Sequence, residues 1–440
     1  MVHSHDVILE KIREDPIAGC LVEMFPPDLI LRLSRETGML KRQRLLDPIL
    51  FFWVLVFQFG ANFTRKIRGL QRSYEVSARI EMSDSAFFER FTPELEELLH
   101  RSVLHAIEFQ GQNVSRKLSD KLDRFNDILI QDSTIVRLHE SLSKLWPAAR
   151  ARGKAAGLKL STLVSVVADS PKRLEITPES TAETKTLKLG PWVKDTILLL
   201  DLGFFKLGFF DRIDAYKGFF VTRLKKGVNA TIVGVNREWR GNAKKLIGEN
   251  LWGIVKSLKR EIIDVEAEFV FERRKYKGKT TKVTRRFRVV GVYNHDAKRY
   301  HIYLTNISPF VLSPEDIALL YGARWEIELI FKELKSTYRM DKITSKKPAV
   351  IRSLIWVAIL TMMCSRRVLN ELRTTDPKNA HRYTHQRGAM IFMERSFILL
   401  LCVLDIMGIE FTKEDQVKLY RLQVMDPNIG RDRLMDRWVT

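Results

Sequence analysis

The chain has 440 residues, 45% of them hydrophobic, which is enough for two or three domains with a sizeable core. Lysine and arginine total 74 against 53 aspartates and glutamates, giving a formal net charge of +21. This charge favours a polyanionic partner such as nucleic acid over a small neutral molecule. The cysteines are too dispersed to indicate a disulfide framework or a zinc site, so we expect reduced core residues in a cytosolic protein. They are Cys20, Cys364 and Cys402.

Neither a secretory signal nor a membrane span is predicted. The N-terminus lacks a basic segment followed by an apolar one. Three apolar runs, at 48–59, 354–364 and 397–404, are each shorter than the roughly 20 residues that a spanning helix needs. We therefore interpret them as buried helices.

The first 115 residues have a helical pattern, interrupted at Pro26-Pro27 and at Gly60. Ser83 or Asp84 can cap one of these helices. No helix-turn-helix motif stands out. A basic cluster, which either faces solvent or contacts a polyanion, consists of Arg65, Lys66, Arg68 and Arg72.

The pattern then changes to strands. Residues Ile128 to Ile130 indicate a buried strand with Asp132 near its end. After a basic linker at 150–159, further strands are predicted at 160–167 and 174–177, and the three could form an antiparallel meander. A mundane explanation of Asp132 is that its side chain ends the strand in an Asx turn.

A second apolar strand, Ile197 to Leu200, ends at Asp201 and follows a predicted helix at 192–196. The alternative of an Asx turn applies to Asp201 as well. Another strand is predicted at 217–226. Competing acids near this position are Asp195, Asp211 and Asp214.

Residues 227–307 have the texture of strands separated by turns, and the block looks inserted between a strand and a later helix. One turn is a basic tip, Arg273 to Arg286, with eight lysines or arginines. It is either a solvated hairpin or a phosphate clamp, and its charges have no evident means of being buried. The strand-like segments are 265–271, 287–293 and 300–304.

A single helix is predicted from Pro314 to Lys335, with Ser313 as its cap and acidic residues in its first turn. At about 100° per residue, one stripe of this helix is polar. Its members are Tyr321, Arg324, Glu328, Lys332 and Lys335. A neighbouring face expected to pack on a core contains Leu320, Ile327, Phe331 and Leu334. The alternative is a solvated helix with i,i+4 ion pairs. Two apolar helices, at 349–372 and 387–408, follow.

The spacing Y-x2-R-x3-E-x6-K, formed by Tyr321, Arg324, Glu328 and Lys335, resembles the signature of the DDE transposases of bacterial insertion sequences, the IS-four group. Trp325 directly follows the arginine. The family implies two upstream acids, each on or beside a strand of a ribonuclease-H-like sheet. Asp132 and Asp201 match the order D, D, E. Asp201 is preferred over its competitors because four apolar residues precede it and because the family has a similar Asp-x-Gly-aromatic context.

The resemblance implies an α/β fold: a ribonuclease-H-like catalytic core with a β-rich insertion, flanked by mainly helical N- and C-terminal regions. The expected regions are a helical DNA-binding region at 1–115, the first part of the core at 120–226, the insertion at 227–307, the second part of the core with the acidic helix at 308–345, and a helical C-terminal region at 346–440.

The resemblance also implies the chemistry. Asp132, Asp201 and Glu328 would hold two Mg²⁺ ions, with Mn²⁺ as a substitute, because hard oxygen ligands suit these ions. Trp325 either fills the core or stacks on a displaced base. The residues expected to contact DNA are Tyr321, Arg324, Lys335, Trp325, Arg223, Lys225, Arg273, Arg274 and Lys275.

The expected function is cut-and-paste transposition: metal-dependent cleavage at the ends of an insertion sequence and transfer of the 3′-OH into target DNA. Partners would be double-stranded DNA, with its terminal inverted repeats and target, and a second copy of the chain in the DNA complex, in the cytoplasm with the nucleoid and without a membrane. Two alternatives stay open, a transposase-derived DNA-binding protein without activity and a nuclease of the same fold without strand transfer. Nucleotide-binding loops and zinc-protease motifs are absent from the sequence.

Overall fold

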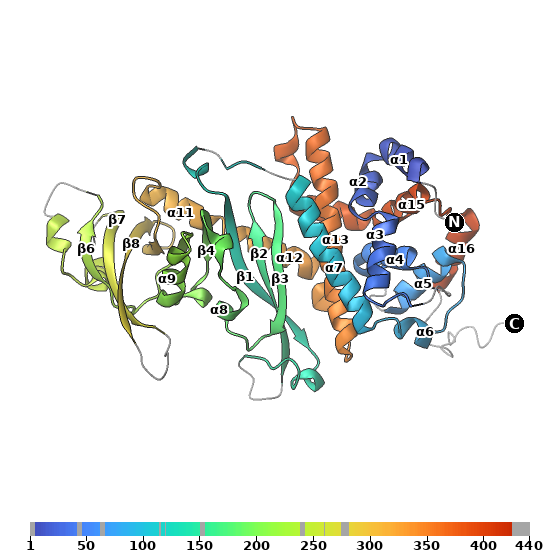
Figure 1. Cartoon of the computed structure of the whole chain (residues 1–440), viewed down its shortest axis with the longest axis horizontal. Coiled ribbons are helices and arrows are strands. Elements are labelled where there is room, and N and C mark those ends of the chain that lie inside the picture. The colour runs from blue at the N-terminus through green and yellow to red at the C-terminus, as the bar shows by residue number, and fades with distance from the viewer. Residues whose placement is uncertain are drawn as a thin grey trace, which may run out of the picture. The chain divides into compact units, whose positions relative to one another are not determined.

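The computed structural model describes residues 5–41, 46–61, 67–113, 116–118, 120–149, 155–237, 243–258, 260–273 and 281–424. The chain divides into two compact units. One combines Met1–Gln110 with Lys332–Thr440, and the other is Gly111–Phe331. The N- and C-terminal helical segments, which the sequence suggested as separate regions, therefore fold together (Figure 1).

The helical unit is built from both ends of the chain. Its N-terminal helices are α1 (His5–Glu14), α2 (Pro16–Met24), α3 (Pro27–Glu36), α4 (Pro48–Ala61), α5 (Ile67–Ala78), α6 (Asp84–Phe88) and α7 (Pro93–Asn113). Its C-terminal helices are α13 (Pro348–Thr375), α14 (His385–Glu394), α15 (Ser396–Ile406) and α16 (Lys413–Val424). The expected break at Pro26-Pro27 is confirmed, and Ser83 caps α6 by accepting a hydrogen bond from the Ala86 N–H.

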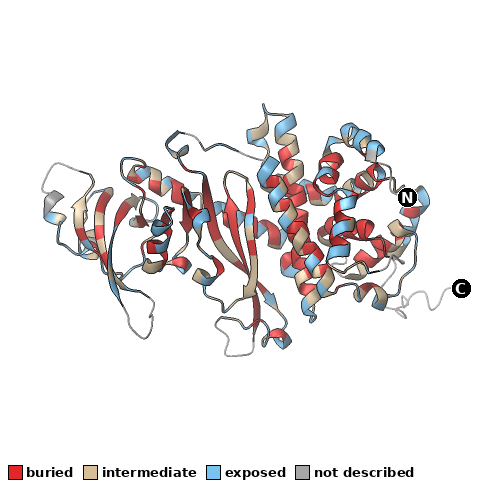
Figure 2. Cartoon of the chain, viewed as in Figure 1, coloured by how far each residue is buried: buried red, intermediate tan, exposed pale blue. Residues whose placement is uncertain are grey.

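The core of the helical unit lies around α4 and α13. The Thr361 hydroxyl of α13 donates a hydrogen bond of 2.7 Å to the Val56 carbonyl of α4. Within the described ranges, α13 alone is long and apolar enough to span a membrane, with a mean hydropathy of 1.7 over 18 residues. Because 83% of that stretch is buried inside the unit, α13 has the character of a core helix, as the sequence predicted (Figure 2).

Two predictions for this unit were wrong in detail. Gly60 does not interrupt α4, which continues to Ala61, and a Cβ at Gly60 would lie 2.5 Å from the Met393 side chain. The glycine therefore allows close packing rather than a break. The helix predicted at 387–408 is two helices that meet at Arg395, which ends α14 and precedes α15.

The other unit contains one nine-stranded sheet with the order β3-β2-β1-β4-β5-β9-β8-β7-β6. The strands are β1 (Asp127–Leu138), β2 (Ala156–Ser165), β3 (Ser170–Pro178), β4 (Thr196–Leu200), β5 (Phe219–Arg223), β6 (Thr231–Val235), β7 (Ile262–Glu272), β8 (Lys282–Asn294) and β9 (Arg299–Thr305). The predicted antiparallel meander of β1, β2 and β3 is confirmed, and β4 and β5 run parallel to β1. Because β9 pairs with β5, the block at 227–307 extends the same sheet.

Three boundaries differ from the sequence analysis. Strand β1 does not end near Asp132 but continues to Leu138, because β2 pairs with it as far as Ala156. The expected linker therefore ends before Ala156, and Lys159 lies buried within β2. The predicted helix at 192–196 is a 3₁₀ turn, Pro191–Val193, since Thr196 already pairs with Asp127 of β1.

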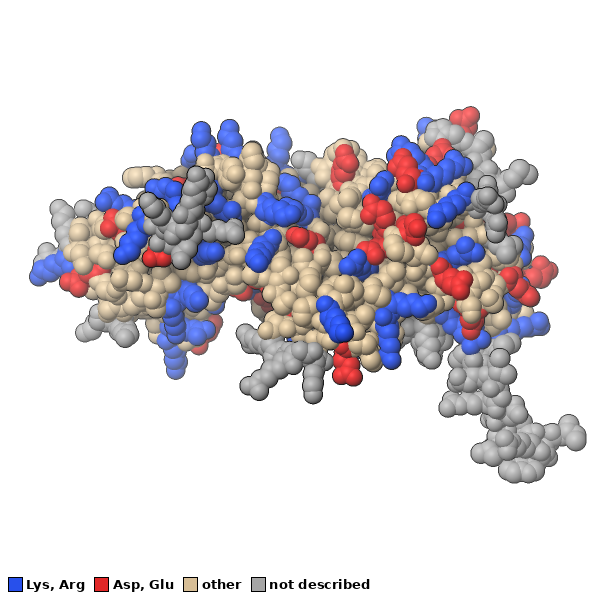
Figure 3. Space-filling model, turned by 60° about the horizontal axis from the view of Figure 1, so that its bottom comes forward, with Lys and Arg blue, Asp and Glu red and all other residues tan. Residues whose placement is uncertain are grey.

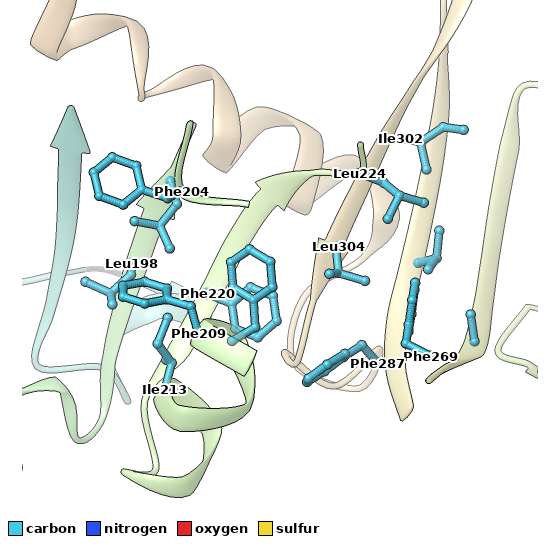
Figure 4. Close-up of a cluster of buried hydrophobic side chains, with 14 of the residues drawn as sticks. Leu198, Phe204, Phe209, Ile213, Phe220, Leu224, Phe269, Phe287, Ile302 and Leu304 are labelled. Carbon is cyan, nitrogen blue, oxygen red and sulfur yellow. The ribbon is translucent and has the colours of Figure 1, made fainter. Parts of the chain in front are cut away.

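Helices cover both faces of the sheet. Helix α9 (Leu207–Ala215) packs on one face, where Phe209 and Ile213 belong to the same buried cluster as Phe220 (Figure 4). The Phe210 and Phe220 rings stack with centroids 4.7 Å apart. Side chains alternate between faces along a strand, so Tyr303 of β9 faces away from its neighbour Leu304, which belongs to this phenylalanine-rich core. The Tyr303 ring contacts Tyr321 of α11 (Pro314–Gly322), which places α11 on the opposite face.

The start of α11 is fixed by a buried ion pair. Arg288 of β8 donates to both carboxylate oxygens of Asp264 of β7, and both side chains are only 2% exposed. The same guanidinium donates to the carbonyls of Ile307 and Leu312 in the loop before the helix. Ser313 then caps α11 in a reciprocal box with Asp316, as predicted.

Candidate active site

Two of the predicted acids lie at neighbouring positions of the sheet. In the parallel ladder between β1 and β4, Gln131 is the register partner of Leu200. Asp132 and Asp201 come next on the two strands, at the point where this ladder ends. Acids separated by 69 positions in sequence are thus brought side by side by strand pairing.

The third acid, Glu328, comes from a segment for which the sequence predicts a single helix. This prediction is wrong, because the segment forms two helices. Helix α11 ends at Gly322, and α12 (Trp325–Ser336) begins three residues later. The intervening turn has short-range hydrogen bonds, from the Ala323 N–H to Leu320 and from the Arg324 N–H to Tyr321. Tyr321 and Glu328 therefore belong to different helices, and Arg324 lies in the turn.

Arg324 is the centre of the site. Its Nη1 lies 3.2 Å from Asp132 Oδ2, and its Nη2 lies 2.7 Å from Glu328 Oε1. Burial lowers the pKa of Arg324, but the hydrogen bond that Arg324 donates to Glu328 and the charges of Tyr321, Asp201 and Asp132 outweigh burial and leave this pKa above its usual value. Two of the three predicted acids, Asp132 and Glu328, therefore bind the same guanidinium.

The carboxyl group of Asp132 is strongly affected by its surroundings. Burial raises the pKa of its carboxyl to about 6. The Ser133 N–H and the Arg324 charge lower this pKa, whereas the charges of Asp201 and Glu183 raise it. The negative form of Asp132 thus depends on a nearby cation.

The acids have the donor chemistry for a hard metal ion, since carboxylate oxygens are the ligands that Mg²⁺ prefers. In the described part of the chain, no three His, Cys, Asp or Glu side chains are close enough to ligate one ion as they stand. The Arg324 guanidinium lies between Asp132 and Glu328 and takes up oxygens that a metal would need. The site therefore fits a cation, provided that Arg324 withdraws.

A cavity of about 360 Å³ adjoins this centre and is lined by Arg223, Tyr303, Tyr321, Arg324 and Trp325. The guanidinium carbons of Arg223 and Arg324 each lie 5.8 Å from the Tyr321 ring centroid. Burial, followed by the charge of Asp201, raises the pKa of Tyr321 to about 12, so its hydroxyl stays protonated. Trp325 is 60% exposed, which excludes the core-filling alternative.

The remaining predicted contacts lie elsewhere. Lys225 is exposed just after β5. Lys335 lies in the last turn of α12, in the segment that belongs to the helical unit. Arg65, Lys66, Arg274 and Lys275 lie outside the described residues.

The basic tip is less free than its sequence suggested. The Arg273 Nη2 lies 2.8 Å from Asp211 Oδ2, and Arg285 donates to the other oxygen of the same buried carboxylate. Arg286 pairs with Glu268 at 3.4 Å. The three arginines thus have acidic partners on the protein, but their side chains remain 52%, 45% and 70% exposed, in agreement with the expectation that the tip's charges are not buried.

Sequence reasoning missed two residues beside the site, Lys159 and Glu183. Lys159 had been assigned to a linker, yet it lies in a strand whose ten residues are all buried. A single lysine within an apolar run, AGLKLSTLVS, was the available signal that a buried acid lies nearby. Glu183 had no comparable signal, because it stands among polar residues at the start of a short helix.

Comparison with known proteins identifies the family of the chain. The sequence model of the family described as transposase DDE domain matches residues 123–364. The transposase for insertion sequence element IS1151 of Clostridium perfringens is 20% identical over 382 residues, covering 80% of each chain. The transposase for IS231B of Bacillus thuringiensis subsp. berliner is 22% identical over 347 residues, covering 71% of each chain.

A solved structure, the piggyBac transposase synaptic complex with hairpin DNA, aligns with a TM-score of 0.43 and 12% identity, covering 95% of this chain and 86% of that one. The DDE family acts on DNA and generally uses divalent metal ions. The family match covers more than half of this chain and includes Asp132, Asp201 and Glu328. The chain therefore belongs to the DDE transposases of insertion sequences.

Proposed function

We propose that this transposase cuts DNA at the ends of an insertion sequence and joins the freed 3′-OH to target DNA, using Asp132, Asp201 and Glu328 as metal ligands. The observation that carries the proposal is that Asp132 and Glu328 both pair with one cation, Arg324, while Asp201 follows the strand that pairs with the strand of Asp132. Charges drawn from two strands and a helix would repel one another without a positive group between them. A cluster of this kind is built to bind cations.

The strand order supports a ribonuclease-H-like core. Three antiparallel strands are followed by two strands parallel to the first, in the spatial order β3-β2-β1-β4-β5. Asp132 lies on the central strand and Asp201 directly after its parallel neighbour. Glu328 follows on a helix after the sheet is complete, so the fold supplies the three acids from three separate elements.

Two Mg²⁺ ions, or Mn²⁺ in their place, would activate the attacking oxygen and stabilise the leaving oxygen of the phosphodiester. The chain's own contribution is to hold three carboxylates and to grip the phosphate. Arg324 can offer two parallel donors to a phosphate once it leaves the carboxylates. Tyr321 and Lys335 would contact the neighbouring phosphates, and the exposed Trp325 offers a surface for a displaced base.

The proposed partners are the terminal repeats, the target DNA and a second copy of the chain in the DNA complex, acting on the nucleoid in the cytoplasm without a membrane. Figure 3 shows basic side chains spread over the face in view, interspersed with acidic ones. The formal charge of +21 favours DNA through phosphate contacts along an extended path. Arg223, the last residue of β5, and Lys225, two residues later, would belong to that path.

The test is an assay with the purified chain, a fragment carrying the element's end and a supercoiled target plasmid. Joined product in Mg²⁺ or Mn²⁺ supports transposition, cut product alone indicates a nuclease, and bound DNA alone indicates an inactive DNA-binding protein. Asp201→Asn should abolish both cutting and joining while the protein stays folded. Unchanged cleavage by this variant would overturn the assignment of the acids.

A further inference from the structure

A buried lysine lies next to the site. The Lys159 side chain is 7% exposed, in the middle of β2. Its Nζ donates to the Thr181 carbonyl at 2.6 Å and to Glu183 Oε1 at 2.8 Å. An ammonium group in such surroundings requires an anionic partner, so Glu183 and Lys159 depend on one another.

Glu183 connects this lysine to the predicted metal ligand Asp132. Its Oε1 also accepts a hydrogen bond from the Ser133 hydroxyl at 3.0 Å. The Ser133 backbone N–H, in turn, donates to Asp132 Oδ1 at 2.7 Å. One oxygen of Asp132, Oδ1, is thereby bound to the backbone of the next residue, and the other, Oδ2, is left for Arg324 or for a metal.

Glu183 also lies close to the segment that follows β4 and carries Asp201. A Cβ added at Gly203 would lie 2.9 Å from the Glu183 Cγ. Gly203 comes two residues after Asp201, so the glutamate side chain passes between the segments that carry the two acids. A cavity of about 730 Å³ opens on Asp132, Ser133, Lys159 and Glu183 together.

We propose that Lys159 and Glu183 form a positioning pair for Asp132, an inference that rests on the proposed role of Asp132 in binding metal. The pair holds the Ser133 hydroxyl, and Ser133 holds Asp132 in the orientation that presents Oδ2 to the metal. Partners of this kind orient a ligand without touching the ion. Lys159 balances the charge of Glu183 and holds the orientation of its side chain. Through the hydrogen bond with Ser133, Glu183 in turn holds the orientation of Asp132.

A purely structural ion pair makes a different prediction. It would join β2 to the segment around α8 (Glu183–Thr186), and its loss would lower stability without changing metal affinity in the folded protein. The double variant Lys159→Met, Glu183→Leu separates the two roles. It replaces both charges by apolar groups of similar volume, a change that is often neutral for stability, but it removes the acceptor for Ser133.

We expect the double variant to fold and to bind Mn²⁺ about 10- to 100-fold more weakly, as read from the electron paramagnetic resonance of free Mn²⁺. Cleavage should recover at high Mn²⁺, because the ligands themselves are intact. Ser133→Ala, which keeps the ion pair and removes only the hydroxyl link, should weaken Mn²⁺ binding in the same direction. Glu261→Gln, in an exposed pair with His295, is the matched control and should bind Mn²⁺ normally.

Wild-type Mn²⁺ affinity in both the double variant and Ser133→Ala would overturn the inference. Asp201→Asn distinguishes this failure from failure of the proposed function. If Asp201→Asn loses metal and cleavage while the double variant and Ser133→Ala keep both, only the positioning role is refuted. If Asp201→Asn itself cleaves normally, the assignment of the acids falls, and the positioning role with it.

Discussion

Replacing Arg324 by alanine should tighten metal binding in the absence of DNA. In the structure the guanidinium occupies Asp132 Oδ2 and Glu328 Oε1, so a metal must displace it. The Arg324 side chain is 17% exposed, and its partners are 21% and 36% exposed. These pairs are thus neither fully solvated nor fully buried.

The size of the effect follows from the two ion pairs. Partly solvated ion pairs of this kind contribute about 1 kcal/mol each. Without Arg324, the free energy of metal binding should therefore be more favourable by about 2 kcal/mol, because the metal no longer has to break these two pairs. Since each 1.4 kcal/mol is a factor of ten, the Kd for metal should fall roughly 30-fold. Arg324→Lys keeps a positive charge near the acids and should show a smaller gain.

The assay is a Mn²⁺ titration of DNA-free protein at low salt, followed by electron paramagnetic resonance. The pH should lie well above the value of about 6 for Asp132, so that protons do not compete with the metal. The same Arg324→Ala protein should cleave DNA poorly, because the phosphate loses its two donors. Unchanged or weaker Mn²⁺ binding would show that the guanidinium does not compete for the ligands.

Three further predictions concern stability and DNA binding. Burial raises the pKa of Asp211, but hydrogen bonds from Arg285 and Arg273 bring it below its usual value. The contribution of Asp211 to the free energy of unfolding should therefore be fully present above the pKa of the carboxyl in the unfolded chain, about 4, and should be lost as the pH falls through its lower pKa in the folded protein. Urea titrations of Asp211→Asn should not show this loss. Arg288→Met should lower the free energy of unfolding by about 3–5 kcal/mol, because Asp264 stays buried without its partner; a change under 1 kcal/mol in urea denaturation would contradict this. Trp325→Ala should leave stability within about 0.5 kcal/mol but weaken binding to DNA with an unpaired end base by about 1–3 kcal/mol, whereas equal loss on fully paired DNA would exclude stacking.

Local patterns were sufficient to predict most of the elements. The apolar run before Asp201 is buried as β4, and the Ser313 cap begins α11 as expected. The four apolar positions assigned to the helix face are all buried. Such features depend on neighbours in sequence, so periodicity and capping rules can identify them.

Features that depend on distant residues could not be predicted. Gly322 ends α11, but a glycine is tolerated inside helices, so it does not by itself predict the turn at Ala323 and Arg324, which accompanies the ion pairs of Arg324 with Asp132 and Glu328. Strand β1 runs past Asp132 because β2 is long enough to pair with it. The arginines of the basic tip looked solvated because Asp211 lies more than 60 positions away in sequence. In each case the deciding partner comes from another part of the chain.

The arrangement of the chain also affects how the protein is synthesised. Strand β5 meets its second neighbour, β9, only after about 80 further residues have been added, so its edge stays open to pairing with other chains. Helix α4 lacks its packing partner α13 for longer still, because α13 is synthesised some 300 residues later. An emerging chain therefore leaves one face of a 14-residue apolar helix uncovered until α13 has been made, and chaperone capture or aggregation is expected at this stage. Slowing translation beyond residue 347 should increase the insoluble fraction, whereas slowing it before residue 48 should not.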